Sequence, residues 1–448
     1  MYQRRRPPIP LGPWLVVGLR RSGAAAARAL WARSEAVVCV DSGAPPEAEE
    51  LRAQGMEVWT GVEGLVELNR ARAVVKSPGV PREAPVIAEA RRRGVTVYGE
   101  LELGWRLVER PFVAVTGTNG KTTTAELLGA IWRASGRPVD VAGNVGLAVS
   151  ALAADRRSEA TVICEASSFQ LEDTVAFAPE VALMLNVQPD HLDRHGTFED
   201  YLAAKLKIFA RQGPDDIAIG PPQLLAQAGG RARRVTFGPH WDVDLALRDG
   251  VITWQGADLM RASDVRIRGE HNLENAMGAA AAALSAGIEP DAVCEGLRSF
   301  PGVEHRIEDV ADLDGVLWVN DSKATNVAST SVALDAFAAP VHLILGGQGK
   351  GQDFAPLRDA VAIHARAVYL IGEDAGAIEQ ALDDAADLVR CGDLEHAVAA
   401  AQAAAVAGEV VLLSPACASF DQYPGGYEER GAHFKALVAT LAVSRPPA

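Results

Sequence analysis

The chain has 448 residues, of which 48% are hydrophobic and 23% are charged, a balance typical of a soluble globular protein. This length exceeds one ordinary hydrophobic core and predicts roughly two to four domains. The formal net charge of −15 argues against sequence-independent nucleic-acid binding, which needs a basic face, and it means that local donors must hold any phosphate ligand.

The apolar segments and the cysteines limit the class of protein further. The long apolar runs are strand-sized or broken by charge, so we expect no transmembrane helix. The N-terminal run LGPWLVVGL is short, and two arginines follow it without a small-residue cleavage site, so we expect no signal peptide. The five cysteines lie far apart without a C-x-x-C pair, which argues against zinc ribbons and disulfide frameworks and favours a reducing cytoplasm.

The first predicted unit, residues 1–110, opens with a strand, a glycine-bearing turn, a helix and a second strand that ends at Asp41. This order is that of a Rossmann-like βαβ unit. The turn reads G-L-R-R-S-G, so Arg20 stands where the dinucleotide fingerprint needs its second glycine, and NAD binding is not favoured. A later strand, RAVVK, ends in a turn that contains Ser77 and Gly79.

The second predicted unit, residues 111–300, opens with PFVAVTGTNGKTTTAELL, an apolar strand followed by a glycine turn and a helix. Gly117 and Gly120 leave backbone N–H groups able to bind phosphate oxygens at a helix N-terminus. Lys121 then reaches the β and γ phosphates, and Thr122 is a ligand for magnesium. The motif is a short variant of the P-loop. A glycine-rich surface turn is the alternative, but the flanking strand and helix favour the P-loop.

Other segments of this unit place polar residues after strands or on a helix. Glu165 in EASSFQLE is placed like a metal-holding acid beside a P-loop, with a solvated loop carboxylate as the alternative. His191 in NVQPDHLDRHG follows a strand, and a structural histidine is equally expected there. The spacing of Lys205 and Lys207 on the helix YLAAKLKIF favours two surface lysines. Asn144 in GNVG fits a simple turn as well as a site.

The third predicted unit, residues 301–448, alternates strands such as GVLWVND, VHLILGG and VVLLSPA with helices, as an open, largely parallel α/β sheet does. Ligands of such sheets bind beyond the carboxyl ends of the strands, where this unit carries its polar segments. NDSKATN, residues 320–326, follows the first strand. Lys350 in LGGQGKGQDF indicates an anion-binding turn. SPACASFDQYPGGYEERG follows the last strand with several small and hydroxyl-bearing residues. The alternative to a ligand site there is a helix N-cap supplied by Ser419 or Asp421.

These segments come in one order over nearly the whole chain, and together they resemble the motifs of the Mur ligases of peptidoglycan synthesis. The resemblance extends to HNLENA and HRIE. It implies a three-domain α/β protein: a Rossmann-like domain that binds the UDP of the substrate, a central P-loop ATPase-type domain with a mostly parallel sheet, and a Rossmann-like domain that binds the incoming amino acid. NDSKATN and SPACASFDQ are closer to the member that adds D-glutamate than to the others.

The resemblance also implies ligands for individual residues. The UDP part of the substrate would contact Ser22, Gly23, Asp41, Ser77 and Gly79. ATP would contact Gly117, Thr118, Asn119, Gly120, Lys121, Thr122, Thr123, Asn275, Arg306, Asp321 and Lys323. Asn144 would face the sugar–peptide end of the substrate. The D-glutamate carboxylates would be held by Thr325, Lys350 and Ser419, with Tyr427 packed near them. Asn320 and Asn326 are expected only to shape the turn and cap the next helix.

The metal and catalytic residues follow from the same resemblance. Magnesium, as two ions, would be held by Thr122, Glu165, His191 and Lys205, and the catalytic set would be Lys121, Glu165, His191 and Lys205. Lys205 matches a lysine that is carbamylated in the family. Carbamylation supplies the oxygen ligands that magnesium prefers, and it needs a neutral amine. Lys207 has no such match and is expected to stay a surface lysine.

The implied reaction is ATP-dependent amide formation. The L-alanine carboxylate of UDP-N-acetylmuramoyl-L-alanine is activated as an acyl phosphate and is then attacked by the amine of D-glutamate. A cytoplasmic monomer is expected. The alternatives are a Mur ligase that adds another amino acid, a folylpolyglutamate synthase-like amide ligase, a P-loop kinase or NTPase, and a non-catalytic nucleotide-binding protein.

Overall fold

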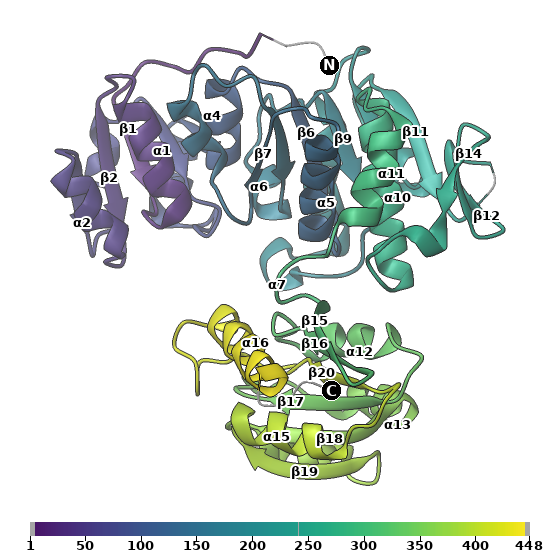
Figure 1. The fold of residues 1–448 in the computed structure, drawn as a ribbon. Helices are drawn as coiled ribbons and strands as arrows, with labels where there is room; N and C mark the ends of the chain where they lie inside the picture. The colour runs from purple at the N-terminus through teal and green to yellow at the C-terminus, as the bar shows by residue number, and fades with distance from the viewer. Residues whose placement is uncertain (1–4, 241, 444–448) are drawn as a thin grey trace. The chain divides into compact units, whose positions relative to one another are not determined.

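The fold is described by a computed structural model that covers residues 5–240 and 242–443, without the side chains of Asp193 and Val443. The chain divides into two compact units. The larger unit comprises Met1–Val265 and His271–Phe300, and the smaller unit comprises Arg266–Glu270 and Pro301–Ala448. The larger unit holds a five-stranded and a nine-stranded sheet, and the smaller unit holds a six-stranded sheet (Figure 1). The expected α/β fold with mostly parallel sheets is confirmed, whereas the residue limits 110/111 and 300/301 stay predictions.

The five-stranded sheet, purple in Figure 1, has the order β3-β2-β1-β4-β5 with parallel pairs throughout. Its strands are β1 Trp14–Val17, β2 Val37–Asp41, β3 Glu57–Thr60, β4 Ala73–Lys76 and β5 Thr96–Gly99, and its helices are α1 Arg21–Trp31, α2 Pro46–Ala53, η1 Glu67–Arg70, α3 Pro85–Arg92 and α4 Glu100–Leu107. The strands β1 and β4 are buried along their whole length, which explains their unbroken apolar runs. Because all five strands are parallel, the turns that follow β1, β2 and β4 lie together at the edge formed by the carboxyl ends of the strands.

The nine-stranded sheet has the order β14-β13-β12-β11-β10-β9-β6-β8-β7, and only β12, β13 and β14 pair in an antiparallel way. Its strands are β6 Phe112–Thr116, β7 Val139–Gly143, β8 Thr161–Glu165, β9 Val181–Met184, β10 Ile217–Gly220, β11 Arg233–Gly238, β12 Leu245–Arg248, β13 Val251–Trp254 and β14 Ala257–Arg261. Its helical segments are α5 Lys121–Ala134, η2 Val149–Ala154, α6 Ser168–Glu172, α7 Leu192–His195, α8 Phe198–Ala210, α9 Pro222–Leu225, η3 Ala262–Asp264, α10 Glu270–Ser285 and α11 Pro290–Ser299. The strand β6 lies between β9 and β8, so the turn after β6 follows an interior strand of the sheet and not an edge strand.

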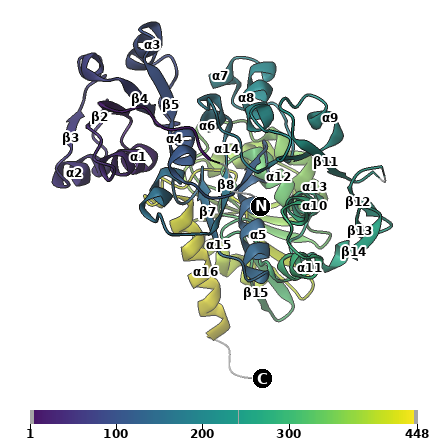
Figure 2. The ribbon, with the colours of Figure 1, turned by 90° about the horizontal axis from the view of Figure 1, so that it is seen from above.

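The alanine-rich helix α10 packs closely, as its composition predicts. Its alanines Ala276 and Ala279–Ala283 are all buried, and the chain leaves the helix through Gly287, whose φ is 79°. Figures 1 and 2 show α5, α10 and α11 gathered on one face of the nine-stranded sheet. A Cβ at Gly296 on α11 would approach a side-chain atom of Ile131 on α5 to 2.6 Å, so these helices need a residue without a side chain at their contact.

Buried carboxylates join the two sheets of the larger unit. Glu100 of α4 accepts hydrogen bonds from the backbone N–H and the hydroxyl of Ser150, at 2.7 and 2.6 Å. Glu102 accepts from the backbone N–H groups of Val175, Ala176 and Phe177. A buried carboxylate is stable only when such donors surround it, so these contacts fix α4 against the central sheet.

The six-stranded sheet has the order β15-β16-β20-β17-β18-β19, and only β15 and β16 are antiparallel. Its strands are β15 Glu308–Leu313, β16 Val316–Asn320, β17 Val341–Gly346, β18 Ala365–Ile371, β19 Asp387–Gly392 and β20 Val410–Leu413. Its helical segments are α12 Val327–Asp335, η4 Ala355–Leu357, α13 Arg358–His364, α14 Ala375–Leu382, α15 Leu394–Ala404 and α16 Tyr427–Val443. Apolar clusters cover both faces of this sheet. Within the described residues, no helix is both long and apolar enough to cross a membrane.

Candidate functional site

The phosphate-binding turn predicted from the sequence lies between β6 and α5. Gly120 has a φ of 83°, and a Cβ there would come within 2.0 Å of the Asn275 side-chain oxygen. Only glycine fits this conformation and this contact. The structure therefore brings Asn275, on α10, directly against the turn, although 155 positions separate the two residues (275 minus 120).

The turn is already occupied by internal partners. The Asn186 side-chain oxygen accepts hydrogen bonds from the backbone N–H groups of Thr118 and Asn119, at 3.1 and 3.0 Å. The Lys121 amine donates to the carbonyl oxygens of Gly117 and Thr118, at 3.1 and 2.9 Å. Backbone donors, a helix N-terminus and a lysine thus converge on one turn, which is the arrangement that binds phosphate.

Glu165 and Asn144, predicted separately, lie in contact. Glu165 ends β8 and is 3% exposed, and its carboxylate accepts a hydrogen bond from the Asn144 side-chain amide at 3.0 Å. The backbone N–H of Asn144 also donates to the Glu165 carbonyl at 2.9 Å. Gly143 has a φ of 122°, and a Cβ there would lie 2.1 Å from that carbonyl oxygen. The turn GNVG is therefore held against the acid, and Glu165 is not a solvated loop carboxylate.

Lys205 is buried, so the surface position favoured by its spacing is wrong. Its side chain is almost inaccessible at 1% exposure, and its amine donates a 2.6 Å hydrogen bond to the Gly117 carbonyl. Burial, and then the positive charge of Lys121, lower the pKa of Lys205 to about 7, against a smaller opposing effect of Asp190. A neutral amine is the condition that carbamylation requires, and the modification itself stays a prediction.

Lys207 is also not a free surface lysine, contrary to expectation. Its amine donates a 2.6 Å hydrogen bond to the carbonyl of Glu172, the last residue of α6, where a cation is favourable. Burial lowers the pKa of Lys207, and the charges of Asp173 and Glu172 oppose that shift. Lys207 thus stabilises a helix end, whereas Lys205 faces the phosphate turn.

His191 is exposed in the segment between β9 and α8, and it has a left-handed φ of 52°. Its ring lies 4.9 Å from the ring of Phe169 and 3.5 Å from an oxygen of Asp190. His195 stacks on the same Phe169, and its Nε2 is 3.0 Å from the Ser168 hydroxyl. Residues 5–240 and 242–443 contain no group of three or more His, Cys, Asp or Glu side chains that forms a metal cage, and the metal role of His191 stays a prediction.

Tyr201 is a site residue that sequence reasoning missed. Its hydroxyl lies 3.1 Å from the Thr118 hydroxyl, and its ring centre lies 4.6 Å from the Lys205 amine. Tyr201 and Lys205 are four positions apart on α8, which places them on one face of the helix. That spacing was the available signal. Thr122 and Thr123, in the first turn of α5, are both largely buried below the phosphate turn.

The residues predicted for UDP meet at the carboxyl edge of the five-stranded sheet. The Asp41 carboxylate accepts from the backbone N–H groups of Leu19 and Gly43, at 2.6 and 2.7 Å. The Ser77 hydroxyl donates to the Gly18 carbonyl at 3.0 Å, and a Cβ at Gly23 would lie 1.7 Å from the same oxygen. These strand ends are therefore packed tightly together. Of the remaining predicted residues, Ser22 lies in the first turn of α1 and Gly79 in the turn after β4, and the divergent Arg20 stands at the N-terminus of α1.

In the smaller unit, Asp321 is enclosed rather than open. It is 4% exposed, and its oxygens accept from the Ile307 N–H at 3.2 Å and from the Ser414 hydroxyl at 2.7 Å. Burial raises the pKa of Asp321 to about 7, although both hydrogen bonds and the charges of nearby arginines oppose that shift. Asp321 thus joins the ends of β16 and β20, and its predicted contact with ATP stays a prediction.

The asparagines of NDSKATN have the structural roles expected of them. The Asn320 amide donates to an oxygen of Glu308 at 3.0 Å and lies 2.9 Å from Nδ1 of His305. The Asn326 side chain accepts from the Ser329 N–H and caps α12. The helix-capping alternative for Ser419 and Asp421 is wrong, because α16 begins only at Tyr427.

The predicted D-glutamate residues lie at the carboxyl edge of this sheet. The Ser419 hydroxyl is buried and has no hydrogen-bond partner among the described residues. The Lys350 amine lies 5.5 Å from the ring centre of Phe420, an exposed aromatic that sequence reasoning missed. Tyr427 instead lies near Lys323, whose amine is 5.5 Å from its ring centre. Thr325 is partly exposed in the turn before α12.

Two arginines of the smaller unit present unpaired donors. Arg430, also missed, donates to the hydroxyl and the carbonyl of Ser322 and to the Cys417 carbonyl, at 3.0, 2.9 and 3.0 Å. Burial lowers the pKa of Arg430 to about 10. Among the described residues its Nη1, like Nε of Arg306, has no hydrogen-bond partner. Buried donors without a partner are rare in folded proteins, so these two atoms are candidate contacts for a bound anionic group or a water.

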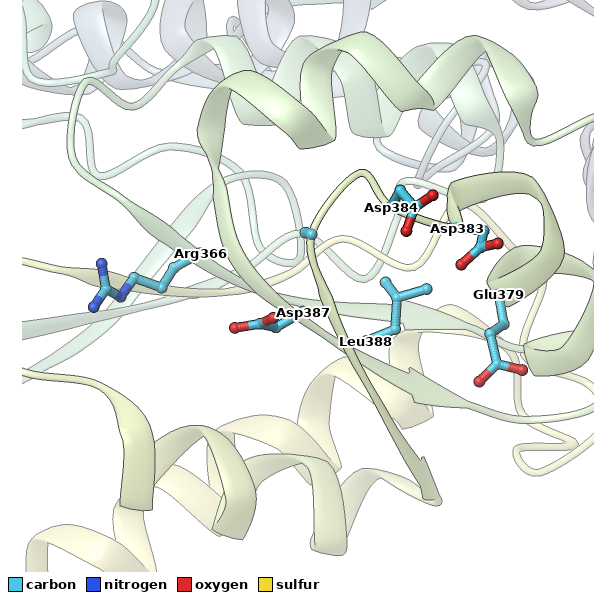
Figure 3. Close-up of a pocket in the computed structure, with 7 residues that line it drawn as sticks. Arg366, Glu379, Asp383, Asp384, Asp387 and Leu388 are labelled. Carbon is cyan, nitrogen blue, oxygen red and sulfur yellow. The ribbon is translucent and has the colours of Figure 1, made fainter.

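A hollow of about 610 Å³ in the smaller unit lies away from these residues. It adjoins the first residues of β18 and β19, which are the amino ends of the strands. Figure 3 shows Asp383, Asp384 and Glu379 on one side of it, with Asp387 and Arg366 beyond. Four carboxylates and one guanidinium disfavour an anionic ligand, so the hollow is not the candidate phosphate or carboxylate site.

Comparison with known proteins gives consistent findings over most of the chain. The family models for a Mur ligase MurD-like N-terminal domain, a Mur ligase middle domain and a Mur ligase glutamate ligase domain match residues 13–99, 115–283 and 305–417. A UDP-N-acetylmuramoylalanine--D-glutamate ligase from Acidobacterium capsulatum is 42% identical over 442 residues and covers 95% of each chain. The protein of that name from Anaeromyxobacter dehalogenans is 45% identical and covers 95% of this chain and 97% of its own.

Solved structures show the fold. A UDP-N-acetylmuramate-alanine ligase from Thermotoga maritima, MurC, superposes with a TM-score of 0.59 at 19% identity, covering 97% of this chain and 100% of its own. A MurF ligase from Thermotoga maritima in complex with ADP gives a TM-score of 0.57 at 19% identity, covering 85% of this chain and 92% of its own.

Proposed function

The chain belongs to the Mur ligase family, and from this premise we propose that it is an ATP-dependent ligase that adds D-glutamate to UDP-N-acetylmuramoyl-L-alanine. The relatives that carry this activity in their names cover 95% of the chain. The structural observation that carries the proposal is that Lys121 and Lys205 converge on the Gly117 carbonyl beside a helix N-terminus. We place the reaction in the cytoplasm and expect a monomer.

ATP is proposed to bind at the turn after β6. Lys121 would exchange the Gly117 and Thr118 carbonyls for phosphate oxygens, since a hydrogen bond to an anion is roughly twice as strong as one to a neutral acceptor. Gly120 leaves room for Asn275 directly against the turn, and Asn275 is a further proposed nucleotide contact. From the smaller unit, Arg306, Asp321 and Lys323 are the proposed nucleotide contacts.

The donor set fits magnesium. Magnesium prefers oxygen ligands and usually keeps several waters, binding through one or two carboxylates and the substrate phosphates, so a complete protein cage is not needed. Glu165 offers a buried carboxylate, Thr122 a hydroxyl, and carbamylated Lys205 would add oxygens, while His191 is the proposed ligand of a second ion. When bound, magnesium would offset the charge of the triphosphate.

The proposed reaction has two steps. An oxygen of the L-alanine carboxylate attacks the γ-phosphorus, the bond to the β–γ bridging oxygen breaks, and ADP leaves. The D-glutamate amine then attacks the acyl carbon, the bond to phosphate breaks, and inorganic phosphate and one proton are released. Lys121 would stabilise the negative charge that develops on the transferring phosphoryl group. Asn144 would hold the reacting end of the sugar–peptide beside Glu165.

D-Glutamate is proposed to bind at the carboxyl edge of the six-stranded sheet. The support is chemical: the Ser419 hydroxyl is buried without a partner in the described chain, and Lys350 supplies a cation on a left-handed turn with a φ of 54°. Thr325 would add a second hydroxyl. Two carboxylates need donors of this kind, and the exposed ring of Phe420 would cover the aliphatic part of the amino acid.

The test is phosphate release from ATP with UDP-N-acetylmuramoyl-L-alanine, measured with and without D-glutamate. We expect release to depend on both. The same assay with L-lysine and diaminopimelate separates the family members, and activation by either in place of D-glutamate would contradict the amino-acid assignment. ATP hydrolysis that ignores both substrates would indicate a P-loop NTPase instead.

A further inference from the structure

Two cationic side chains, Lys76 and Arg194, donate hydrogen bonds to the turn that follows β4, residues 77–80. The Lys76 amine donates to the Val80 carbonyl at 2.8 Å. The Nη2 of Arg194 donates to the carbonyls of Pro78 and Val80, at 3.2 and 3.3 Å. Both carbonyls thus face the central part of the larger unit. We call residues 77–80 the β4 turn.

Arg194 belongs to α7, in the same segment as His191. Its guanidinium carbon lies 4.4 Å from the centre of the Phe169 ring, and its Nη2 lies 3.8 Å from an oxygen of Glu172. The same Phe169 ring contacts His191 at 4.9 Å and stacks on His195 at 5.4 Å. One side chain therefore touches the β4 turn and, through a single aromatic ring, the histidine segment.

Arg194 is not the main support of this region. The ion pair between Lys76 and Asp173 is 2.6 Å long and fully buried, and Asp173 also binds Arg91 at 3.1 Å. Glu102 and its three backbone donors hold α4 independently. The Arg194 side chain, in contrast, is 16% exposed and contacts the β4 turn on one side and Phe169 and Glu172 of α6 on the other. Its contacts therefore serve the placement of the β4 turn against α6 and α7 more than the stability of the fold.

We propose that Arg194 is a positioning residue that couples the β4 turn to the segment of His191. The inference rests on the proposed function together with the expected UDP contacts of Ser77 and Gly79 in the β4 turn and the expected magnesium contact of His191 at the reacting end. A planar guanidinium suits this task because it donates to two carbonyls while its face stacks on a ring, which a lysine ammonium does not do. When the nucleotide sugar fixes the β4 turn, Arg194 and Phe169 transmit that placement to His191.

The test uses the full chain with Arg194→Ala, Arg194→Lys and the control Arg82→Ala. Arg82 contacts the same Glu172 carboxylate at 3.5 Å but, within the described residues, donates no hydrogen bond to the β4 turn carbonyls, and its side chain is 56% exposed. For Arg194→Ala we expect the KM for UDP-N-acetylmuramoyl-L-alanine to rise about tenfold and kcat to fall by a similar factor, because misplacement of a substrate by about 1 Å has effects of this order or larger. The KM values for ATP and D-glutamate should stay within about twofold, and Arg194→Lys should be intermediate.

Calorimetric binding of UDP-N-acetylmuramoyl-L-alanine without ATP gives a readout apart from turnover, and Arg194→Ala should weaken it about tenfold while Arg82→Ala leaves it unchanged. Phe169→Leu tests the contact between Arg194 and His191, because it removes the aromatic ring and keeps the hydrogen bonds of Arg194 to the β4 turn carbonyls. In this variant kcat should fall, with little change in nucleotide-sugar binding. This variant and Arg194→Lys also keep the test decisive if Arg194→Ala does not fold.

Three results would overturn the proposal. They are unchanged nucleotide-sugar binding in Arg194→Ala, an equal rise of all three KM values in that variant, or an unchanged kcat in Phe169→Leu. Failure of the proposed function is a separate outcome, since the unmodified chain would then show no D-glutamate-dependent phosphate release at all.

Discussion

The amine of Lys205 lies 2.6 Å from the carbonyl oxygen of Gly117 and donates a hydrogen bond to it. This contact joins α8 to the phosphate turn, and it places a lysine with a pKa of about 7 directly beside that turn. In a medium near neutral pH, the amine is therefore divided between its charged and neutral forms.

Replacement of Lys205 should abolish turnover while Lys207 tolerates change. Lys205→Arg keeps the charge and the length but does not form a carbamate, so we expect at least about a hundredfold loss of phosphate release, the scale of a lost transition-state contact. Lys207→Ala, the matched control two positions away, should stay within about threefold, since its partner is a helix-end carbonyl. Activity of Lys205→Arg near that of the unmodified chain would contradict the carbamate.

The pH dependence of Lys205 has a definite sign. Its folded pKa lies below the usual value of 10.5, so the neutral amine is populated above about pH 7 and lost below it. Added bicarbonate should therefore stimulate phosphate release in preparations kept near pH 6.5 more than in those kept near pH 8, where the carbamate forms readily. Mass spectrometry of the intact protein at both pH values measures the modification, and equal occupancy at both would contradict the assignment.

Asp321 predicts a pH-dependent stability. Its folded pKa of about 7 is above the ordinary 3.8, so its contribution to the free energy of unfolding is fully present below about pH 4 and is lost as the pH rises through about 7. Thermal unfolding from pH 4 to 8 should show this fall in the unmodified chain and its absence in Asp321→Asn. Ser414→Ala removes a donor that favours the ionised form, and it should shift the fall to higher pH.

Gly120→Ala should lower both stability and nucleotide affinity. The new Cβ would meet the Asn275 oxygen at 2.0 Å on a backbone with a φ of 83°, and strain of this kind costs about 1–3 kcal/mol. Gly136→Ala is the control, because its φ of 71° is similar but no atom of the described residues lies within 4 Å of the added carbon. Equal losses in the two variants would show that the contact with Asn275 is immaterial.

Ser419→Ala should separate binding from stability. The hydroxyl has no partner in the described chain, so its removal should leave the melting temperature unchanged or slightly raised. If Ser419 binds D-glutamate, the KM for that substrate should rise about tenfold, the usual worth of a hydrogen bond to a charged group. A lower melting temperature with an unchanged KM would assign Ser419 to the fold alone.

Lys323→Ala and Thr325→Ala test whether the turn after β16 serves two ligands. The first should mainly raise the KM for ATP, and the second mainly that for D-glutamate. Their matched position in one turn makes each the control for the other. The same pattern of losses in both variants would remove the proposed division.

The strands, the phosphate turn and the polar segments that follow the strands can be predicted from the sequence, because each depends on a local pattern of residues. Burial of Lys205 is different in kind. It depends on which face of α8 meets the phosphate turn, and spacing along one helix carries no information about a partner that is 88 positions away. Resemblance identified Lys205, but neither route found the contact of Lys207 with the end of α6.

Turn lengths explain the other misses. The residues between Ser419 and Tyr427 form turns that include Gly426, with a φ of 89°, and they delay α16 beyond the point where Ser419 or Asp421 could cap it. The delay also places Tyr427 beside Lys323 and leaves Phe420 beside Lys350. Arg194 and Arg430 escaped notice because most of their hydrogen-bond acceptors are backbone carbonyls far away in the sequence, which have no side-chain signature.

The amide oxygen of Asn186 occupies the two N–H groups at the head of the phosphate turn. An arriving nucleotide would find this turn already shaped, and it would replace one acceptor by another instead of ordering a mobile loop. The entropic cost of ordering the turn is then a cost of folding and not of each nucleotide-binding event. Asn186→Ala should leave the turn without its resident acceptor, and ATP would bind with a more unfavourable entropy and a larger heat release.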